Sequence, residues 1–153
     1  MAATRSSFTQ TAQANIKRQL LEHPATAQFF RGMGDRIICA DPGELLTTLA
    51  EKIAGLSLGI IIELVGGPAP RWGEEQWDAE ITIFENPVLN RVGNWDGKSA
   101  DVVLDAVLRC FADCGAFVPG PVSQLPGEER TGWIVHGKTT VAMTDSPNPG
   151  GQC

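Results

Sequence analysis

The chain has 153 residues, 42% of them hydrophobic and 20% charged, with a formal net charge of −6 at pH 7. This composition is typical of one globular domain and excludes a disordered chain. The negative charge argues against binding along a nucleic-acid backbone, which requires a basic surface. We expect a single domain over residues 1–153, globular from 9 to 143, with flexible arms at 1–8 and 144–153.

The sequence shows neither a membrane span nor a secretory signal. Its most apolar run, residues 56–65, is too short to cross a bilayer and includes Glu63. The N-terminus lacks the apolar stretch of a signal peptide. We therefore expect synthesis in the cytoplasm.

The first predicted helix covers residues 9–23. Pro24 ends it, because proline cannot continue a helix that has already begun. Residues 25–34 are predicted to be a connector that Phe29 and Phe30 anchor to the core. The predicted buried stripe of the helix consists of Ala12, Ile16 and Leu20.

A short strand over residues 37–39 is expected next, followed by a second helix. Asp41 is suited to cap this helix, Pro42 to be its first residue and Glu44 to complete a capping box. Gly55 is expected to end it.

A long β-hairpin is predicted from the next two strands. Residues 58–65 are apolar on both faces, as in a strand that is covered on both sides. Residues 66–75 break regular structure, as a hairpin loop or an arm. Residues 77–85 alternate, which predicts one packed and one solvated face. The packed face consists of Trp77, Ala79, Ile81 and Ile83, and the solvated face of Asp78, Glu80 and Thr82.

The clearest helical pattern begins near Ser99. Its core face consists of Val103, Leu104, Val107, Leu108, Cys110 and Phe111, and its solvent stripe of Asp101, Asp105 and Arg109. Asp105 and Arg109 are spaced to form a pair. Residues 117–127 form a proline-rich crossing without periodicity, and residues 133–143 resume strand alternation, where Gly137 could mark a tight turn that splits the strand.

This order of elements predicts an α+β fold. We expect a mostly antiparallel sheet with a long β-hairpin and with helices packed on one face.

The sequence shows no catalytic or metal-binding set. Spacing nominates no nucleophile partner for His23 or His136, and the nucleophile-elbow, P-loop and dinucleotide motifs are absent. Cys110 and Cys114 share a helix face but lack the further ligands of a zinc site, so we interpret them as buried thiols. We expect no catalytic residue, no cofactor and no metal.

Two segments are candidates for a docking surface instead, namely the polar loop at residues 85–96 and the tip of the predicted hairpin. Tryptophan and arginine are enriched where protein interfaces gain most of their binding free energy. For Trp72 and Trp95, capping of the core is an equal alternative. We expect a docking surface made of Arg71, Trp72, Glu85, Asn86, Asn90, Arg91, Trp95 and Asp96.

A strand ending in EITIFENPVLNR that leads through a polar loop into GKSADVVLDAVLRCF resembles small bacteriophage proteins of the tail-terminator and tail-completion group. The resemblance covers residues 9–143 as a pattern of elements. It implies a non-enzymatic virion subunit that forms a hexameric ring, caps the tail tube and joins it to head-completion and neck proteins. An acidic lumen would let DNA pass without sequence-specific binding. The long crossing at 117–127 and the tryptophan in the hairpin tip depart from the family pattern.

Two other functions stay open. A small-ligand-binding or enzymatic domain would use the solvated strand face and the 85–96 loop, and would have a concave pocket with convergent polar groups. An adaptor domain would bind one protein partner through Trp72 and Trp95.

Overall fold

The computed structural model describes residues 5–30, 34–40, 58–71, 74–85, 100–112, 115–124 and 131–142. The predicted helix after Asp41 lies outside these residues. The described helices are α1 (Arg5–Glu22), α2 (Pro24–Phe30), the 3-10 turn η1 (Gly34–Arg36) and α5 (Ala100–Cys110). The described strands are β1 (Ile37–Cys39), β2 (Leu58–Arg71), β3 (Glu74–Glu85), β4 (Val118–Gln124) and β5 (Thr131–Ala142).

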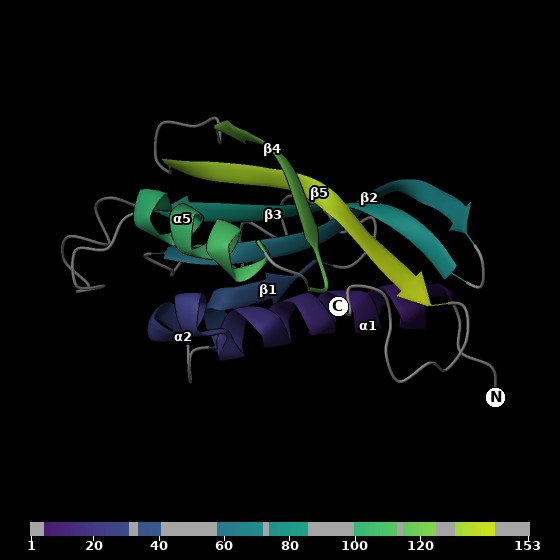
Figure 1. Ribbon diagram of the computed structural model, residues 1–153, viewed down its shortest axis with the longest axis horizontal. Helices are drawn as coiled ribbons and strands as arrows, with labels where there is room; N and C mark the ends of the chain where they lie inside the picture. Colours follow the sequence, from purple (N-terminus) through teal and green to yellow (C-terminus); the bar gives the residue numbers. More distant parts are fainter. Residues whose placement is uncertain are drawn as a thin grey trace.

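The five strands form one sheet in the order β1-β2-β3-β5-β4. Every neighbouring pair is antiparallel except β1 and β2, which are parallel. The α-helices of the described part lie together on one face of the sheet (Figure 1), with α1 against β2 and β5 and α5 against β3 and β5. The predicted α+β class, with its long hairpin and its helices on one face, is confirmed.

The core lies between the helices and this face of the sheet. Alternate residues of β2 and β3 face it in register, so that Ile62 lies beside Ile81 and Ile60 beside Ile83. The predicted stripe of α1 is buried, as are the four residues Val103, Val107, Cys110 and Phe111 at the core face of α5. Leu104 and Leu108 are partly buried against the same cluster. Periodicity in the sequence therefore located most of the core correctly.

Two glutamines of α1 connect the helix to distant backbone. The buried amide of Gln13 donates to the carbonyl of Ala40 at 2.6 Å and to that of Ile62 at 3.0 Å. The amide nitrogen of Gln19 donates to the carbonyl of Cys110 at 3.0 Å, and its oxygen accepts from the backbone of Ala116 at 2.9 Å. These contacts fix α1 against the sheet and against the end of α5.

The prediction that residues 66–75 break regular structure was wrong. β2 and β3 stay paired as far as Arg71 and Glu74, with a bulge between Val65 and Ala69 that accommodates the Gly-Gly-Pro segment. Within the described residues, β1 pairs only with residues 60–62 of β2. Prolines are tolerated in β2 beyond that point because its outer edge needs no ladder donor there.

The proline-rich crossing also contains a strand that the sequence pattern did not reveal. β4 pairs with β5 as an edge strand, with a bulge between Pro119 and Val122. β5 runs without a turn through Gly137, so the predicted split was wrong. A β-carbon at Gly137 would collide with the ring of Phe117 and the carbonyl of Val118. The glycine therefore permits close packing.

Residues 25–30 form a helix rather than the predicted irregular connector. Pro24 is the first residue of α2, a position that proline favours. The Nδ1 atom of His23 accepts a hydrogen bond from the backbone of Ala25 at 3.0 Å and so caps α2. Phe29 and Phe30 are buried, as predicted.

The second face of the sheet is covered at one end. Ile61 and Phe84 are buried there in a small cluster with Ala40. Thr82, predicted to be solvated, is 9% exposed. Toward the hairpin end, this face carries exposed or half-buried polar side chains, and we call that region the open face.

Candidate functional site

Most of the predicted docking surface lies outside the described residues, namely Trp72, Asn86, Asn90, Arg91, Trp95 and Asp96. Arg71 ends β2, where its backbone pairs with Glu74. Glu85 ends β3, and its carboxylate accepts a hydrogen bond from the backbone of Ala100 at 3.4 Å. Because Ala100 is the first residue of α5, this contact caps the helix.

Charged side chains gather instead on the open face, where strand register places them in two rows. The first row consists of Glu63, Glu80 and His136, and the second of Val65, Asp78 and Lys138. Directly opposite residues on one face of an antiparallel pair have neighbouring side chains. The alternation of β3 and β5, with Ala79, Ile81 and Val135 turned into the core, therefore aligns these polar groups on the other side.

His136 lies at the centre of the first row. Its Nδ1 atom is 3.4 Å from Oε1 of Glu80, and its Nε2 atom shares a hydrogen bond of 2.8 Å with Oγ of Ser123 on β4. Glu63 and Glu80 face each other across β2 and β3.

The second row contains an exposed ion pair. Lys138 Nζ lies 2.8 Å from Asp78 Oδ1, and both side chains are more than half exposed. Such pairs contribute only about 0–1 kcal/mol. Either partner can therefore exchange its contact for one with a bound group at small cost.

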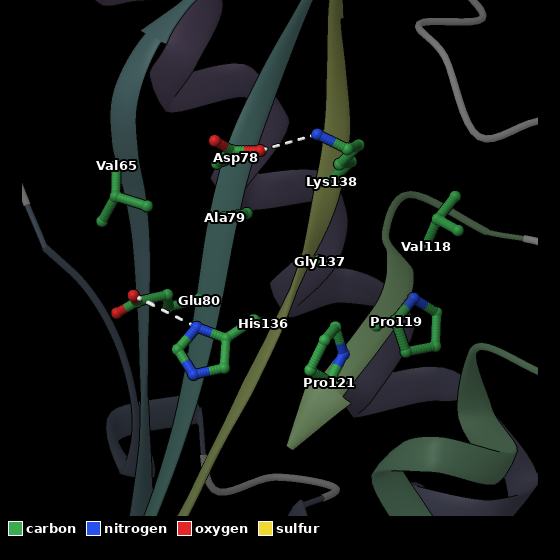
Figure 2. A pocket seen from close by; sticks show the side chains of 11 residues that line it. Val65, Asp78, Ala79, Glu80, Val118, Pro119, Pro121, His136, Gly137 and Lys138 are labelled. Carbon is green, nitrogen blue, oxygen red and sulfur yellow. Dashed lines mark hydrogen bonds and ion pairs between the residues drawn. The ribbon is translucent and has the colours of Figure 1, made fainter. Parts of the chain in front are cut away.

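These rows border an open cavity of roughly 480 Å³ between β3, β5 and the bulge of β4. Figure 2 shows Glu80, His136, Asp78 and Lys138 on the near side of the strands, with Pro119 and Pro121 opposite them. The apolar side chains that line the cavity are those of Val65, Val118, Pro119 and Pro121. The volume falls in the range of small-ligand sites.

The arrangement suits recognition better than nucleophilic catalysis. Ser123, His136 and Glu80 form a continuous row of polar contacts, but Ser123 is not part of the cavity lining. A molecule in the cavity would meet the imidazole and the carboxylates before the hydroxyl. Within the described ranges, no group of three or more His, Cys, Asp or Glu side chains is placed to hold a metal ion.

The described thiols belong to the core side of the molecule. Cys110 is buried, and burial raises the pKa of its thiol to about 11 although Thr26 and Gln19 offer hydrogen bonds that oppose the shift. A thiol of this pKa is almost fully protonated at neutral pH and is a poor nucleophile. Cys114 and Cys153 lie outside the described residues.

The sequence pattern placed Asp78 and Glu80 on the solvated face, but it missed His136, Lys138 and Ser123 as their neighbours. His136 and Lys138 alternate with Val135 and Thr139. That alternation could have found them if Gly137 had not been interpreted as a turn. Ser123 lies on β4, and no apolar pattern in the sequence predicts this strand.

Comparisons with known proteins found no matching family model, no matching curated protein and no matching solved structure. Among the described helices, none combines the length and apolar character needed to cross a membrane.

Proposed function

We propose that this chain is a non-enzymatic virion subunit of the tail-terminator type, which forms a ring that caps the tail tube and joins it to the head and neck. Its partners are further copies of itself, in a hexameric ring, together with the tube and the head-completion or neck proteins. Its final location is the virion, after synthesis in the host cytoplasm.

The observation that carries this proposal is the one-sided architecture. A sheet with a long β2–β3 hairpin carries α1, α2 and α5 on a single face. The opposite face keeps an open polar region and the sheet ends in an edge strand with two exposed valines, Val118 at 63% and Val122 at 38%. A subunit with two chemically different faces is suited to head-to-tail contacts, which form a ring when the rotation between neighbouring copies closes.

The net charge of −6 is consistent with DNA passage through such a ring. Like charge between the lumen and the phosphate backbone disfavours adhesion. DNA would then be a passing partner without sequence-specific contacts.

Purified protein, alone and mixed with purified tails, tests the proposal. Light scattering coupled to chromatography should give a single oligomer, and negative-stain micrographs should show rings, free or at the ends of tubes. A strict monomer at high concentration that also fails to decorate tails would contradict the proposal.

The cavity on the open face favours one alternative, a small-ligand-binding domain. The convergent polar groups of the cavity lie on the predicted solvated strand face, whereas residues 86–96 of the loop in that hypothesis lie outside the described residues. Ligand screening by thermal shift, compared between the wild type and Glu80→Gln, tests it. A ligand that raises the Tm of the wild type but not of the variant would support this alternative.

A further inference from the structure

Three polar side chains form a row that runs across neighbouring strands of the open face. Glu80 of β3 is directly opposite His136 of β5, and Figure 2 shows the two side chains turned toward each other. Ser123 of β4 pairs with Ile134, two residues before His136 on β5, so the serine lies diagonally across from the imidazole on the same face. The pairing of β5 with both neighbours therefore assembles the row.

The two contacts of His136 indicate which ring nitrogen carries the proton of the neutral imidazole. Oε1 of Glu80 lies 3.4 Å from Nδ1, and a carboxylate can only accept hydrogen bonds. The proton is therefore favoured on Nδ1, which leaves the lone pair of Nε2 free to accept. Oγ of Ser123 lies 2.8 Å from Nε2, so the hydroxyl donates to it. The hydroxyl thus has a proton acceptor in place.

Ser123 is open to solvent. Its side chain is exposed on β4, which is the last strand in the order of the described sheet. Ser123 does not line the cavity, so a reagent reaches the hydroxyl from solvent beside β4. Chemistry at this hydroxyl is therefore separate from what the cavity binds.

A purely structural role is the alternative for this row. The hydrogen bond between Ser123 and His136 would then only hold the bulged edge strand against β5. Holding a strand needs no carboxylate behind the imidazole. A hydroxyl that contacts a base, which is in turn oriented by a third group, is the arrangement that activates serine as a nucleophile. Glu80 behind His136 therefore favours the activated hydroxyl.

We propose that Ser123 is a covalent modification site that takes up an acyl group from an activated ester. A bond forms between Oγ and the carbonyl carbon, and the bond from that carbon to the leaving oxygen breaks. The Oγ proton passes to Nε2 of His136 and then to the leaving oxygen, while Glu80 acts as a positioning residue for the imidazole. One transfer occupies the hydroxyl, so this is a modification of the proposed structural subunit. It does not depend on ring assembly.

Labelling with a fluorophosphonate tests the inference. This probe forms a bond between Oγ and phosphorus and releases fluoride, and mass spectrometry of the digested protein locates the adduct. The wild type should carry the adduct on Ser123, and Ser123→Ala should carry none there. His136→Gln keeps a hydrogen-bonding group on β5 but no base. Its labelling rate should fall by about 10²–10⁴-fold, the usual contribution of a general base.

The pH dependence of labelling distinguishes a base from a structural contact. In acid both nitrogens of His136 carry protons, so neither can accept the proton of the hydroxyl. The labelling rate of the wild type should therefore rise as the imidazole loses its proton, and that of His136→Gln should lack this rise. The charged groups around the ring are Glu80 and Asp78 on β3, Lys138 on β5 and, opposite Glu80, Glu63 on β2.

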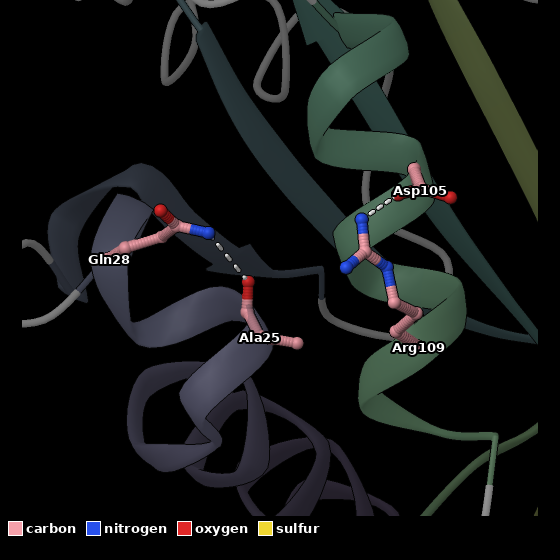
Figure 3. A network of polar contacts seen from close by, with 4 residues as sticks. All are labelled: Ala25, Gln28, Asp105 and Arg109. Carbon is pink, nitrogen blue, oxygen red and sulfur yellow. Dashed lines mark hydrogen bonds and ion pairs between the residues drawn. The ribbon is translucent and has the colours of Figure 1, made fainter.

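Glu80→Gln should also slow the labelling, by a smaller factor, because the imidazole loses the carboxylate that orients it. Asp105→Asn is the matched control, since it removes a carboxylate that pairs with Arg109 on the surface of α5 (Figure 3). This control should be labelled at the rate of the wild type.

Either of two results would overturn the inference. One is a wild type that is labelled no faster than His136→Gln, and the other is a label that persists undiminished in Ser123→Ala. Circular dichroism spectra that match the wild type will show that the variants are folded. Because labelling needs no assembly, either result would leave the proposed ring untouched.

Discussion

At Gly132, the backbone of β5 passes so close to β3 that an added β-carbon would collide with the carbonyl oxygen of Ile83. The colliding atom is backbone in the middle of the sheet, so it cannot move aside as a flexible side chain could. Gly132→Ala is expected to lower the free energy of unfolding by about 1–3 kcal/mol or more, as overpacking does. Urea unfolding of the variant and the wild type measures this loss.

Gly34→Ala is the matched control for that experiment. A β-carbon there would lie 3.6 Å from the Cε atom of Lys17, an ordinary van der Waals contact. Its unfolding free energy should stay within about 0.5 kcal/mol of the wild type, as surface substitutions usually do. Equal destabilisation by the two alanines would contradict the close approach of β5 to β3.

The buried thiol of Cys110 makes stability depend on alkaline pH. Its folded-state pKa is about 11 against an ordinary value of 9.0, so the unfolded chain releases this proton first as the pH rises. The free energy of unfolding should therefore be unaffected below pH 9 and fall between pH 9 and pH 11, by up to about 2.7 kcal/mol. Chemical unfolding across this pH range measures the loss.

Cys110→Ala separates this effect from the titration of the lysines and the other cysteines, because the variant and the wild type both carry those groups. The variant should be less stable by a constant amount at neutral pH, and the difference should shrink above pH 9. Parallel stability curves for the two proteins over pH 7–11 would show that the thiol does not carry the pH dependence.

At the scale of elements, Gln13 joins three pieces of the fold. Its buried amide supplies hydrogen bonds to Ala40 after β1 and to Ile62 of β2. Gln13→Leu removes the amide donor, so the buried carbonyl oxygens of Ala40 and Ile62 each lose one hydrogen bond. We expect a loss of roughly 2–3 kcal/mol in unfolding free energy, the cost of unsatisfied buried groups.

Gln28→Leu is the comparison for Gln13→Leu. Gln28 is exposed on α2, and its amide donates to Ala25 within the same helix (Figure 3). Its replacement should change the Tm little. A Gln13→Leu variant as stable as Gln28→Leu would contradict the role of Gln13 as the link between α1 and the sheet.

The same scale explains which elements could be predicted. α1 and α5 each have a continuous stripe of apolar side chains, and apolar and polar residues alternate along β3. The buried face of each element could therefore be predicted from the sequence. β4 could not be predicted from the sequence. It is an edge strand with two prolines and a bulge, so it pairs on one side only and needs no alternating pattern of apolar residues. The second half of β2 was missed for the same reason.

At the scale of the whole molecule, the proposed assembly predicts sensitivity to salt. A contact between copies that uses the charged groups of the open face would be partly exposed, and raising NaCl from about 0.05 M to about 0.5 M shortens the Debye length from roughly 14 Å to roughly 4 Å. The protein concentration at half-assembly should rise several-fold over this range, as measured by mass photometry. Assembly that strengthens with NaCl would indicate an apolar contact instead.

The site itself depends on the whole molecule more than on any element. Asp78 and Glu80 were predicted on the solvated strand face, and they border the cavity. His136 and Ser123 joined them only because β5 pairs with β3 on one edge and with β4 on the other. Eight residues were predicted as a docking surface, and of these Glu85 has a described side-chain contact that caps a helix.

The sequence by itself determined the α+β class, the buried faces of α1, β3 and α5, and the Asp105–Arg109 pair, because each follows from periodicity within one element. Only the tertiary structure decided the strand order, the pairing of the proline-containing strands and the grouping of Glu80, His136 and Lys138 around one cavity. These features depend on register between segments that lie far apart in the chain. Local patterns do not encode that register, since it is fixed by how the strands pair and by how the glycines and bulges let them approach.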